Sequence, residues 1–183
     1  HGAVEAEFRI DGRTVWVSQM ETHTVFELDA ATRTQRRSFD TLSNWSKVIE
    51  ASPDGARLYV SNWNFDDISE IALGDGATVR RIPSTKTPRG LYASRDGRSL
   101  YVAGFGEGVC ERITLETGAR TPMFVGTALR HIVPSPDEAL LYVTDMGGRG
   151  VWRYDIAAGA VRRLVRTDAN PNTCALTPDG RVL

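Results

Sequence analysis

Short runs of apolar residues follow one another along the whole chain, and glycine, proline, aspartate or asparagine separates them. The runs are rich in β-branched and aromatic residues and too short for helices, which is typical of β-strands. Four related runs are Val15-Trp16-Val17-Ser18, Leu58-Tyr59-Val60-Ser61, Leu100-Tyr101-Val102-Ala103 and Leu141-Tyr142-Val143-Thr144. No stretch has a helical period, so the pattern predicts an all-β protein.

One turn signature precedes these runs at an almost constant interval. Its copies are Ile10-Asp11-Gly12, Ser52-Pro53-Asp54-Gly55, Ser94-Arg95-Asp96-Gly97, Ser135-Pro136-Asp137-Glu138 and Thr177-Pro178-Asp179-Gly180. Their aspartates are 43, 42, 41 and 42 residues apart. Such a period indicates one supersecondary unit, stacked repeatedly, that buries its apolar faces only against its neighbours.

Each repeat holds four apolar runs, one before the turn and three after it. Four antiparallel strands in about 40 residues, repeated, form the blade of a β-propeller. We therefore predict a propeller of four-stranded antiparallel blades, about four of them plus the start of a fifth, in a single domain over residues 1–183. The expected repeats are approximately 1–44, 45–86, 87–127, 128–169 and 170–183.

The repeat also carries a family resemblance. The run Ser-Pro-Asp-Gly-x-x-Leu-Tyr-Val-Ser-Asn at Ser52 to Asn62, its echoes at Ser94 and Ser135, and Tyr-Val-Thr-Asp at Tyr142 to Asp145 resemble the YVTN-type (YncE-like) propeller repeats of bacteria. The resemblance covers essentially the whole chain. It implies a seven-bladed propeller and a periplasmic or cell-surface location.

The number of repeats bears on completeness. A blade face without a neighbour would expose on the order of 500 Å² of apolar surface. We therefore expect the chain to be a fragment of a seven-bladed propeller, with any signal peptide outside it, and a closed four-blade ring is the alternative.

Charge and composition exclude some partners. The chain has 22 basic and 23 acidic residues, so no global field attracts nucleic acid, and no run is long enough to cross a membrane. Cys110 and Cys174 each replace an aliphatic core residue, which predicts neither a zinc site nor a disulfide framework. The predicted outermost strands carry Arg36-Arg37, Arg80-Arg81 and Arg162-Arg163, which we interpret as solvated sheet edges.

A column of basic residues opens the innermost strands. Its members in successive repeats are Lys47, Arg89, Arg130 and Asn172. In a propeller these positions point toward one channel mouth, where converging positive charge favours a carboxylate or phosphate. The alternative is that each stem packs on the next blade and pairs with a nearby acid.

A second column follows the Tyr-Val strand and places a large apolar residue in each loop. Its members are Met20, Trp63, Phe105 and Met146. They form either an apolar collar beside the basic ring or packing between blades. His131, next to Arg130, is expected to face the channel, as a hydrogen-bonded strut or as the first candidate for proton transfer. The predicted ligand-binding residues are Lys47, Arg89, Arg130, His131, Asn172, Trp63, Phe105 and Met146.

The leading functional prediction is a non-enzymatic binding module without a cofactor, which presents this mouth to an anionic small molecule, a peptide or a protein partner. The chain contains no nucleophile elbow, His-Glu-x-x-His motif or P-loop. One alternative is a lactonase-like (sugar-lactone) hydrolase, similar in architecture, in which Glu5, Asn62 and Asp145 hold calcium or magnesium. Another is an accessory propeller domain of a larger surface or redox protein.

Overall fold

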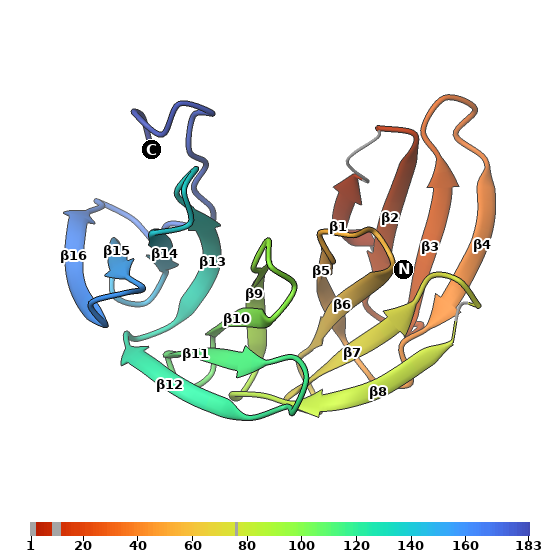
Figure 1. Cartoon of the computed structure of the whole chain (residues 1–183), viewed down its shortest axis with the longest axis horizontal. Helices are drawn as coiled ribbons and strands as arrows, with labels where there is room; N and C mark the ends of the chain where they lie inside the picture. Colours follow the sequence, from red (N-terminus) through yellow and green to blue (C-terminus); the bar gives the residue numbers. More distant parts are fainter. Residues whose placement is uncertain (1–2, 9–11, 76) are drawn as a thin grey trace.

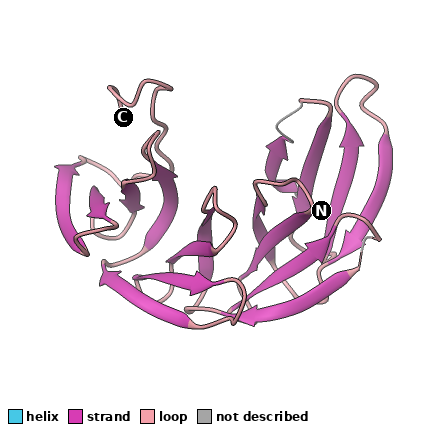
Figure 2. Cartoon of the chain, in the orientation of Figure 1, coloured by secondary structure: helices cyan, strands magenta, loops and turns pink. Residues whose placement is uncertain are grey.

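A computed structural model describes residues 3–8, 12–75 and 77–183 of the chain. It contains sixteen strands and, within those ranges, no helix (Figure 2). Blade 1 consists of β1 (Ala3–Phe8), β2 (Thr14–Gln19), β3 (Thr24–Asp29) and β4 (Gln35–Asp40), and blade 2 of β5 (Ser46–Ala51), β6 (Arg57–Asn62), β7 (Asp67–Ala72) and β8 (Thr78–Pro83). Blade 3 consists of β9 (Pro88–Ala93), β10 (Ser99–Gly104), β11 (Val109–Thr114) and β12 (Arg120–Val125), and blade 4 of β13 (Leu129–Pro134), β14 (Leu140–Asp145), β15 (Gly150–Asp155) and β16 (Ala160–Arg166).

Every blade is a four-stranded antiparallel sheet whose strands lie in chain order. The sheets fan around an open arc, with the first strand of each blade on the concave side and the last at the outer edge (Figure 1). The inner strands β1, β5, β9 and β13 contact one another in succession. The predicted all-β fold of propeller blades is confirmed.

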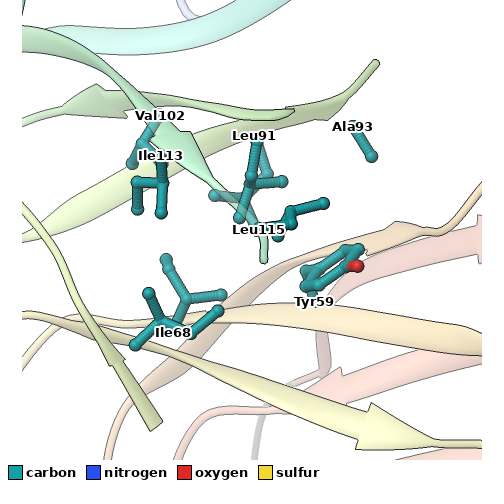
Figure 3. Close-up of a cluster of buried hydrophobic side chains, with 9 residues drawn as sticks. Tyr59, Ile68, Leu91, Ala93, Val102, Ile113 and Leu115 are labelled. Carbon is teal, nitrogen blue, oxygen red and sulfur yellow. The ribbon is translucent and has the colours of Figure 1, made fainter. Parts of the chain in front are cut away.

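The hydrophobic core consists of three layers, each between two consecutive blades. Figure 3 shows the layer between blades 2 and 3, where Tyr59 and Ile68 meet Leu91, Val102 and Ile113. Side chains in a strand alternate between the two faces of the sheet. Leu100 and Val102 accordingly pack toward blade 2, whereas Tyr101 packs toward blade 4. The Leu-Tyr-Val motif therefore joins each blade to both neighbours.

The repeated turn is held by its own side chains. Ser52 Oγ donates a hydrogen bond to Asp54 Oδ1 over 2.5 Å, and the Asp54 carboxylate also accepts from Ala56 N. Gly55 has a φ of +67°, in the left-handed region that glycine tolerates best. In the fourth copy Glu138 takes this conformation, with a φ of +57°. In the first copy Ile10 and Asp11 lie outside the described residues.

The arginines of the outer strands do not simply solvate the sheet edges, as the sequence had suggested. Three of them, Arg37, Arg80 and Arg120, form ion pairs with buried glutamates of the adjacent strand, Glu27, Glu70 and Glu111. The side chains of Glu70 and Glu111 are only 2% and 1% exposed, whereas the arginines are 34% to 41% exposed. We call these three residues the outer arginines; they neutralise charge inside the blades.

The two cysteines differ in burial. Cys110 is fully buried in the layer between blades 3 and 4, as expected for a replacement of an aliphatic core residue, and burial raises the pKa of its thiol. Cys174 is only partly buried, and burial raises its pKa to about 11. Both thiols are free.

Candidate functional site at the channel mouth

The predicted basic column lies at irregularities in strand pairing. In β9 and β13 the register skips Arg89 and Arg130, and in β5 it skips Lys47 together with Val48. β1 has the same irregularity between Ala3 and Glu5. A β-bulge bends a strand and re-aims its side chain, so the same backbone feature presents each cation. We call Lys47, Arg89 and Arg130 the mouth cations, and the end of the inner strands where they lie the mouth.

Hydroxyl groups of the second strands hold these bulges. Ser61 Oγ accepts a hydrogen bond from Val48 N over 3.0 Å and donates to the carbonyl oxygen of Arg89, 3.3 Å away, in the next blade. Thr144 Oγ1 likewise accepts from His131 N. Ser18 Oγ donates to the carbonyl of Lys47 over 2.6 Å. Each hydroxyl replaces a strand-pairing hydrogen bond that the bulge removes.

A different feature allows the inner strands of blades 3 and 4 to lie close together. Blade 3 has Ala103 at the position of Ser61, so no side-chain hydroxyl reaches the carbonyl of Arg130 from there. Opposite that carbonyl lies Gly90, where a Cβ atom would lie 2.8 Å from the oxygen of Arg130. The missing side chain of Gly90 therefore permits the close contact between β9 and β13.

Aromatic rings flank the mouth cations. Lys47 Nζ lies 4.4 Å from the ring centroid of Trp63 and 5.2 Å from that of Trp45. Arg89 Cζ lies 5.6 Å from the same Trp63 ring. Trp63 also stacks on Trp45 and on Phe105, with centroids 6.4 Å and 5.6 Å apart. Cations at these distances are attracted to the negative faces of the rings.

Two methionine sulfur atoms complete this surface. Lys47 Nζ donates to Met20 Sδ over 2.6 Å, and Arg130 Nη1 lies 3.6 Å from Met146 Sδ. The loop column is therefore neither a separate collar nor core packing alone. The basic and apolar columns interleave into one half-buried surface, which we call the mouth cluster. Its members are Met20, Trp45, Lys47, Trp63, Arg89, Phe105, Arg130 and Met146.

The mouth cations have no ion-pair partner within 4.0 Å among residues 3–8, 12–75 and 77–183. The carboxylate of Glu5 interacts electrostatically with Arg89 and Arg130. Burial raises the pKa of Glu5, and the two arginines lower it without reversing that rise. Lys47 contacts Met20 of blade 1 and Arg89 faces Trp63 of blade 2, whereas Arg130 contacts Met146 of its own blade.

Repulsion among the cations changes their titration. Burial lowers the pKa of Lys47, and the positive charges of Arg89 and Arg130 lower it further. Burial and the charge of Arg130 likewise lower the pKa of Arg89, against a smaller opposing effect of Glu5. An anion bound among these groups would relieve the repulsion and gain charge-assisted hydrogen bonds. The site is therefore electrostatically complementary to a carboxylate or phosphate group.

His131 and Asn172 complete the set of predicted ligand-binding residues. His131 Nδ1 is buried and has no hydrogen-bond partner in the described part of the chain. Burial lowers the pKa of His131. A hydrogen bond with the backbone of Cys174 raises this pKa, and the positive charge of Arg89 lowers it further. Asn172 is exposed and lies outside any strand, and its backbone carbonyl accepts from Thr144 Oγ1 over 3.3 Å. The structure therefore groups His131 with the mouth cations and leaves the side chain of Asn172 in solvent.

Of the alternative metal ligands, Asn62 and Asp145 are engaged inside their blades. Asn62 is fully buried; its Oδ1 accepts from Ser46 Oγ, and its Nδ2 donates to Asp67 and Ser69. Asp145 accepts from the side chain of Trp152 and from the backbone N–H groups of residues 127, 128 and 148. Burial raises the pKa of Asp145, but these hydrogen bonds outweigh it and lower the pKa overall.

Glu5, the third candidate ligand, lies in blade 1. No three His, Cys, Asp or Glu residues of the described ranges form a group that could hold a metal ion. A calcium or magnesium site at Glu5, Asn62 and Asp145 stays a prediction, which a calcium titration of the protein tests.

Trp45 is a site residue that the sequence pattern did not predict, although it lies two residues before Lys47. Its backbone has a φ of +59°, and its carbonyl accepts from Trp63 N over 3.2 Å. This hydrogen bond holds the Trp45 and Trp63 loops together. A tryptophan just before an inner strand is a weak signal that becomes informative only when the stacked partner is known.

Comparison with known proteins places the fold among β-propellers. No protein-family model matches the chain. Antigen Lp49 from Leptospira interrogans serogroup Icterohaemorrhagiae serovar copenhageni (strain Fiocruz L1-130) is 32% identical over 190 residues, which cover 100% of this chain and 42% of the antigen. Hydrazine synthase from Kuenenia stuttgartiensis superposes with a TM-score of 0.89 and 25% identity over 98% of this chain and 54% of the synthase chain.

The chain thus spans about half the length, or less, of both proteins that it resembles. The match over nearly all of the chain agrees with the four blades described above and supports a β-propeller fold. The narrower YVTN-type (YncE-like) identification stays a prediction. Among the described residues, no helix is long and apolar enough to cross a membrane.

Proposed function

We propose that this chain is a binding module whose mouth cations hold an anionic group of a small molecule, a peptide or a protein partner. The observation that carries the proposal is the convergence of Lys47, Arg89 and Arg130 without an ion-pair partner in the described structure. Half-buried cations that repel one another cost free energy. A bound anion offsets that cost, and the aromatic rings of the mouth cluster contact the rest of the ligand.

The relatives support a role at the cell surface or in the periplasm. The name of the Leptospira relative describes an antigen. An antigen is a molecule that antibodies meet, and an exported location is consistent with that. We therefore propose an exported protein whose propeller face meets partners outside the cytoplasm.

A second proposal is that the chain serves as an accessory propeller domain of a larger redox or surface protein. The likeness to a chain of hydrazine synthase, of which this chain covers 54%, favours it. The two proposals are compatible, because an accessory domain also uses a binding face. The domain content of the full gene and a search for co-purifying subunits test the second proposal.

The test of the first proposal is a titration with citrate, whose three carboxylates match three cations. Trp45 and Trp63 flank Lys47, so their fluorescence reports binding. We expect saturable binding to the wild-type protein. The double variant Arg89→Glu/Arg130→Glu should bind at least about 100-fold more weakly, because each lost charge-assisted hydrogen bond contributes about 1.5–3 kcal/mol.

The matched control is Arg98→Glu/Arg112→Glu, which changes the net charge equally at two exposed arginines away from the mouth. This control should bind citrate as the wild type does. Both double variants should keep a melting temperature within about 4 °C of the wild type, since neither pair neutralises a buried carboxylate. Equal weakening in both variants, or no saturable binding to the wild type, would contradict the proposal.

A further inference from the structure

A cavity of about 300 Å³ lies on the same face as the mouth, between the loops of blades 1 and 2. Its apolar walls are Leu42 and Phe65, which are 59% and 54% exposed. The remaining lining residues are His23, Asp40, Ser43 and Asn44. This volume is at the lower end of the roughly 300–1,000 Å³ of ligand pockets, and suits one amino-acid side chain rather than a cofactor.

Hydrogen bonds fix the floor of this cavity. Ser43 is 3% exposed, and its Oγ donates to Asp67 Oδ1 over 3.1 Å. His23 Nδ1 donates to the carbonyl oxygen of Ser43 over 2.6 Å. On the wall, the Arg81 guanidinium lies 4.8 Å from the centroid of the Phe65 ring and pairs with Asp67. The cavity is thus preformed, which lowers the entropic cost of binding.

The loop before β5 has a defined backbone conformation that holds Leu42 at the cavity. Leu42 and Trp45 have φ values of +54° and +59°, in the left-handed region that is costly for residues with a Cβ atom. Leu42 gains no burial in return, because more than half of its side chain is exposed. The Leu42 N–H donates a hydrogen bond to Asp40 Oδ1 over 2.7 Å, and the conformation of Trp45 recurs at Thr87, just before the inner strand of the next blade, with a φ of +51°.

The cavity and the mouth cluster share the same two loops. Residues 41–45 carry Leu42 at the cavity and Trp45 beside Lys47. Residues 63–66 carry Trp63 at the mouth and Phe65 at the cavity. Phe65 is two residues from Trp63, and Leu42 is three residues from Trp45. Two and three residues of chain span at most about 7 Å and about 11 Å, so an extended peptide covers the step from these tryptophans to the cavity in two or three residues.

We propose that the ligand is an extended peptide segment of a partner protein, with an acidic residue two or three positions from a leucine-sized or phenylalanine-sized residue. The acidic side chain lies among the mouth cations, and the apolar side chain enters the Leu42/Phe65 cavity. The inference rests on the proposed function for its charged half. A small anion would fill the mouth and leave the cavity unused, whereas a peptide reaches both and passes over Trp45, whose side chain is 38% exposed.

The experiment compares four N-acetylated, C-amidated hexapeptides on the full chain by isothermal titration calorimetry. The first carries Glu and Leu two positions apart, the second Glu and Ser at those positions, and the third Gln and Leu. The fourth carries Glu and Leu five positions apart. We expect the first peptide to bind about tenfold more tightly than the second and fourth, the effect of burying one leucine-sized side chain. The third should bind at least tenfold more weakly than the first, because it lacks the carboxylate.

Protein variants then assign the gain to the cavity. Phe65→Ser should remove the tenfold preference for the first peptide over the second while leaving binding of the second unchanged. Val161→Ser, at a position 41% exposed in blade 4, is the matched control and should keep the preference. If Phe65→Ser lowers the melting temperature, Leu42→Asn replaces it as the cavity variant.

The outcomes separate this inference from the proposed function. Equal affinity of the first, second and fourth peptides, all lost in Arg89→Glu/Arg130→Glu, overturns the peptide inference and leaves the anion site standing. Equal affinity of the first and third peptides overturns the charged half of the inference. Failure of citrate and of every peptide overturns both the inference and the proposed function.

Discussion

The outer arginines and the mouth cations are the same kind of residue in two different surroundings. Arg120 pairs with Glu111, whose side chain is 1% exposed and which also accepts from Ser84 Oγ and Thr85 N. Arg89 instead faces Trp63 and the like charge of Arg130. Both arginines are positioned by β-strands, but only Arg120 neutralises a buried charge.

This difference separates stability from recognition. A carboxylate that is buried in a blade needs its cation, so the blade loses stability when that cation is removed. A cation held beside like charges contributes less to stability, because repulsion from its neighbours offsets its attraction to the aromatic rings and to Glu5. Whether a basic residue of a propeller blade contributes to stability therefore depends on the group it contacts and not on its position in the repeat.

The largest expected effect on stability comes from Arg120→Met. The substitution keeps the aliphatic stem and leaves the carboxylate of Glu111 without its cation. We expect a loss of about 2 kcal/mol, below the 3–5 kcal/mol of fully buried pairs because the Arg120 side chain is 40% exposed. Urea unfolding measures it. Arg89→Met is the matched variant, and an equal loss there would contradict the comparison.

A second test uses a carboxylate that lacks a guanidinium. Burial raises the pKa of Glu50 to about 8. The hydrogen bond from Ala93 N lowers this pKa, and the negative charge of Glu7 raises it. Burial and the charge of Glu5 raise the pKa of Glu7 to about 7. Folded Glu50 therefore keeps its proton at pH values where the unfolded chain, with an ordinary pKa of 4.5, has released it.

The sign follows from this proton balance. Because the folded state binds the extra proton, the contribution of Glu50 to stability is fully present below about pH 4.5 and is lost as the pH rises toward 8. We expect Glu50 to contribute about 1–2 kcal/mol to this fall, after allowance for partial screening by water. Denaturant unfolding at pH 5 and pH 8 measures it, and Glu50→Gln should flatten the dependence. An unchanged slope in that variant would show that another group is responsible.

A smaller effect is expected at the hydroxyl that joins blades 2 and 3. Ser61→Ala leaves Val48 N and the carbonyl of Arg89 without their hydrogen bonds, which should cost about 1 kcal/mol. Because the hydroxyl also positions Arg89, citrate affinity should fall about threefold. The control variant is Ala103→Ser, which introduces the same hydroxyl at the equivalent position of blade 3. A stability loss without any change in affinity would show that Ser61 does not position the cation.

The smallest effect is a shift in the pH dependence of binding. Burial and the neighbouring arginines lower the pKa of Lys47, so its ammonium group loses its proton at a lower pH than an ordinary lysine would. Citrate affinity should therefore decline, by about threefold for one lost cation contact, at a lower pH than the ordinary pKa of lysine would give. Lys47→Arg should remove the decline. A decline that persists in this variant would assign it to another group.

The sequence predicted the blades because strand alternation is a local property. Leu58, Tyr59 and Val60 alternate between two core layers, and the same alternation recurs in every repeat. It also placed Lys47, Arg89 and Arg130 at equivalent positions. The prediction reached this far because the repeat transfers each position from one blade to the next.

The bulges and the ion pairs could not be predicted from the sequence in the same way. The register at Arg89 depends on Ser61, 28 residues earlier and in another blade. The pairing of Arg120 with Glu111 requires knowing which strand lies beside β12 and which face of it is buried. These are properties of contacts between strands, and a hydropathy pattern holds no information on them.

Gly90 also sets the width of the opening. Its missing side chain lets the backbone of Arg130 lie against β9, where even a methyl group would collide with backbone atoms that cannot turn aside. An alanine there would wedge blades 3 and 4 apart and carry Arg130 away from Arg89. The separation between the inner strands that carry Arg89 and Arg130 therefore depends on the absence of a side chain at Gly90.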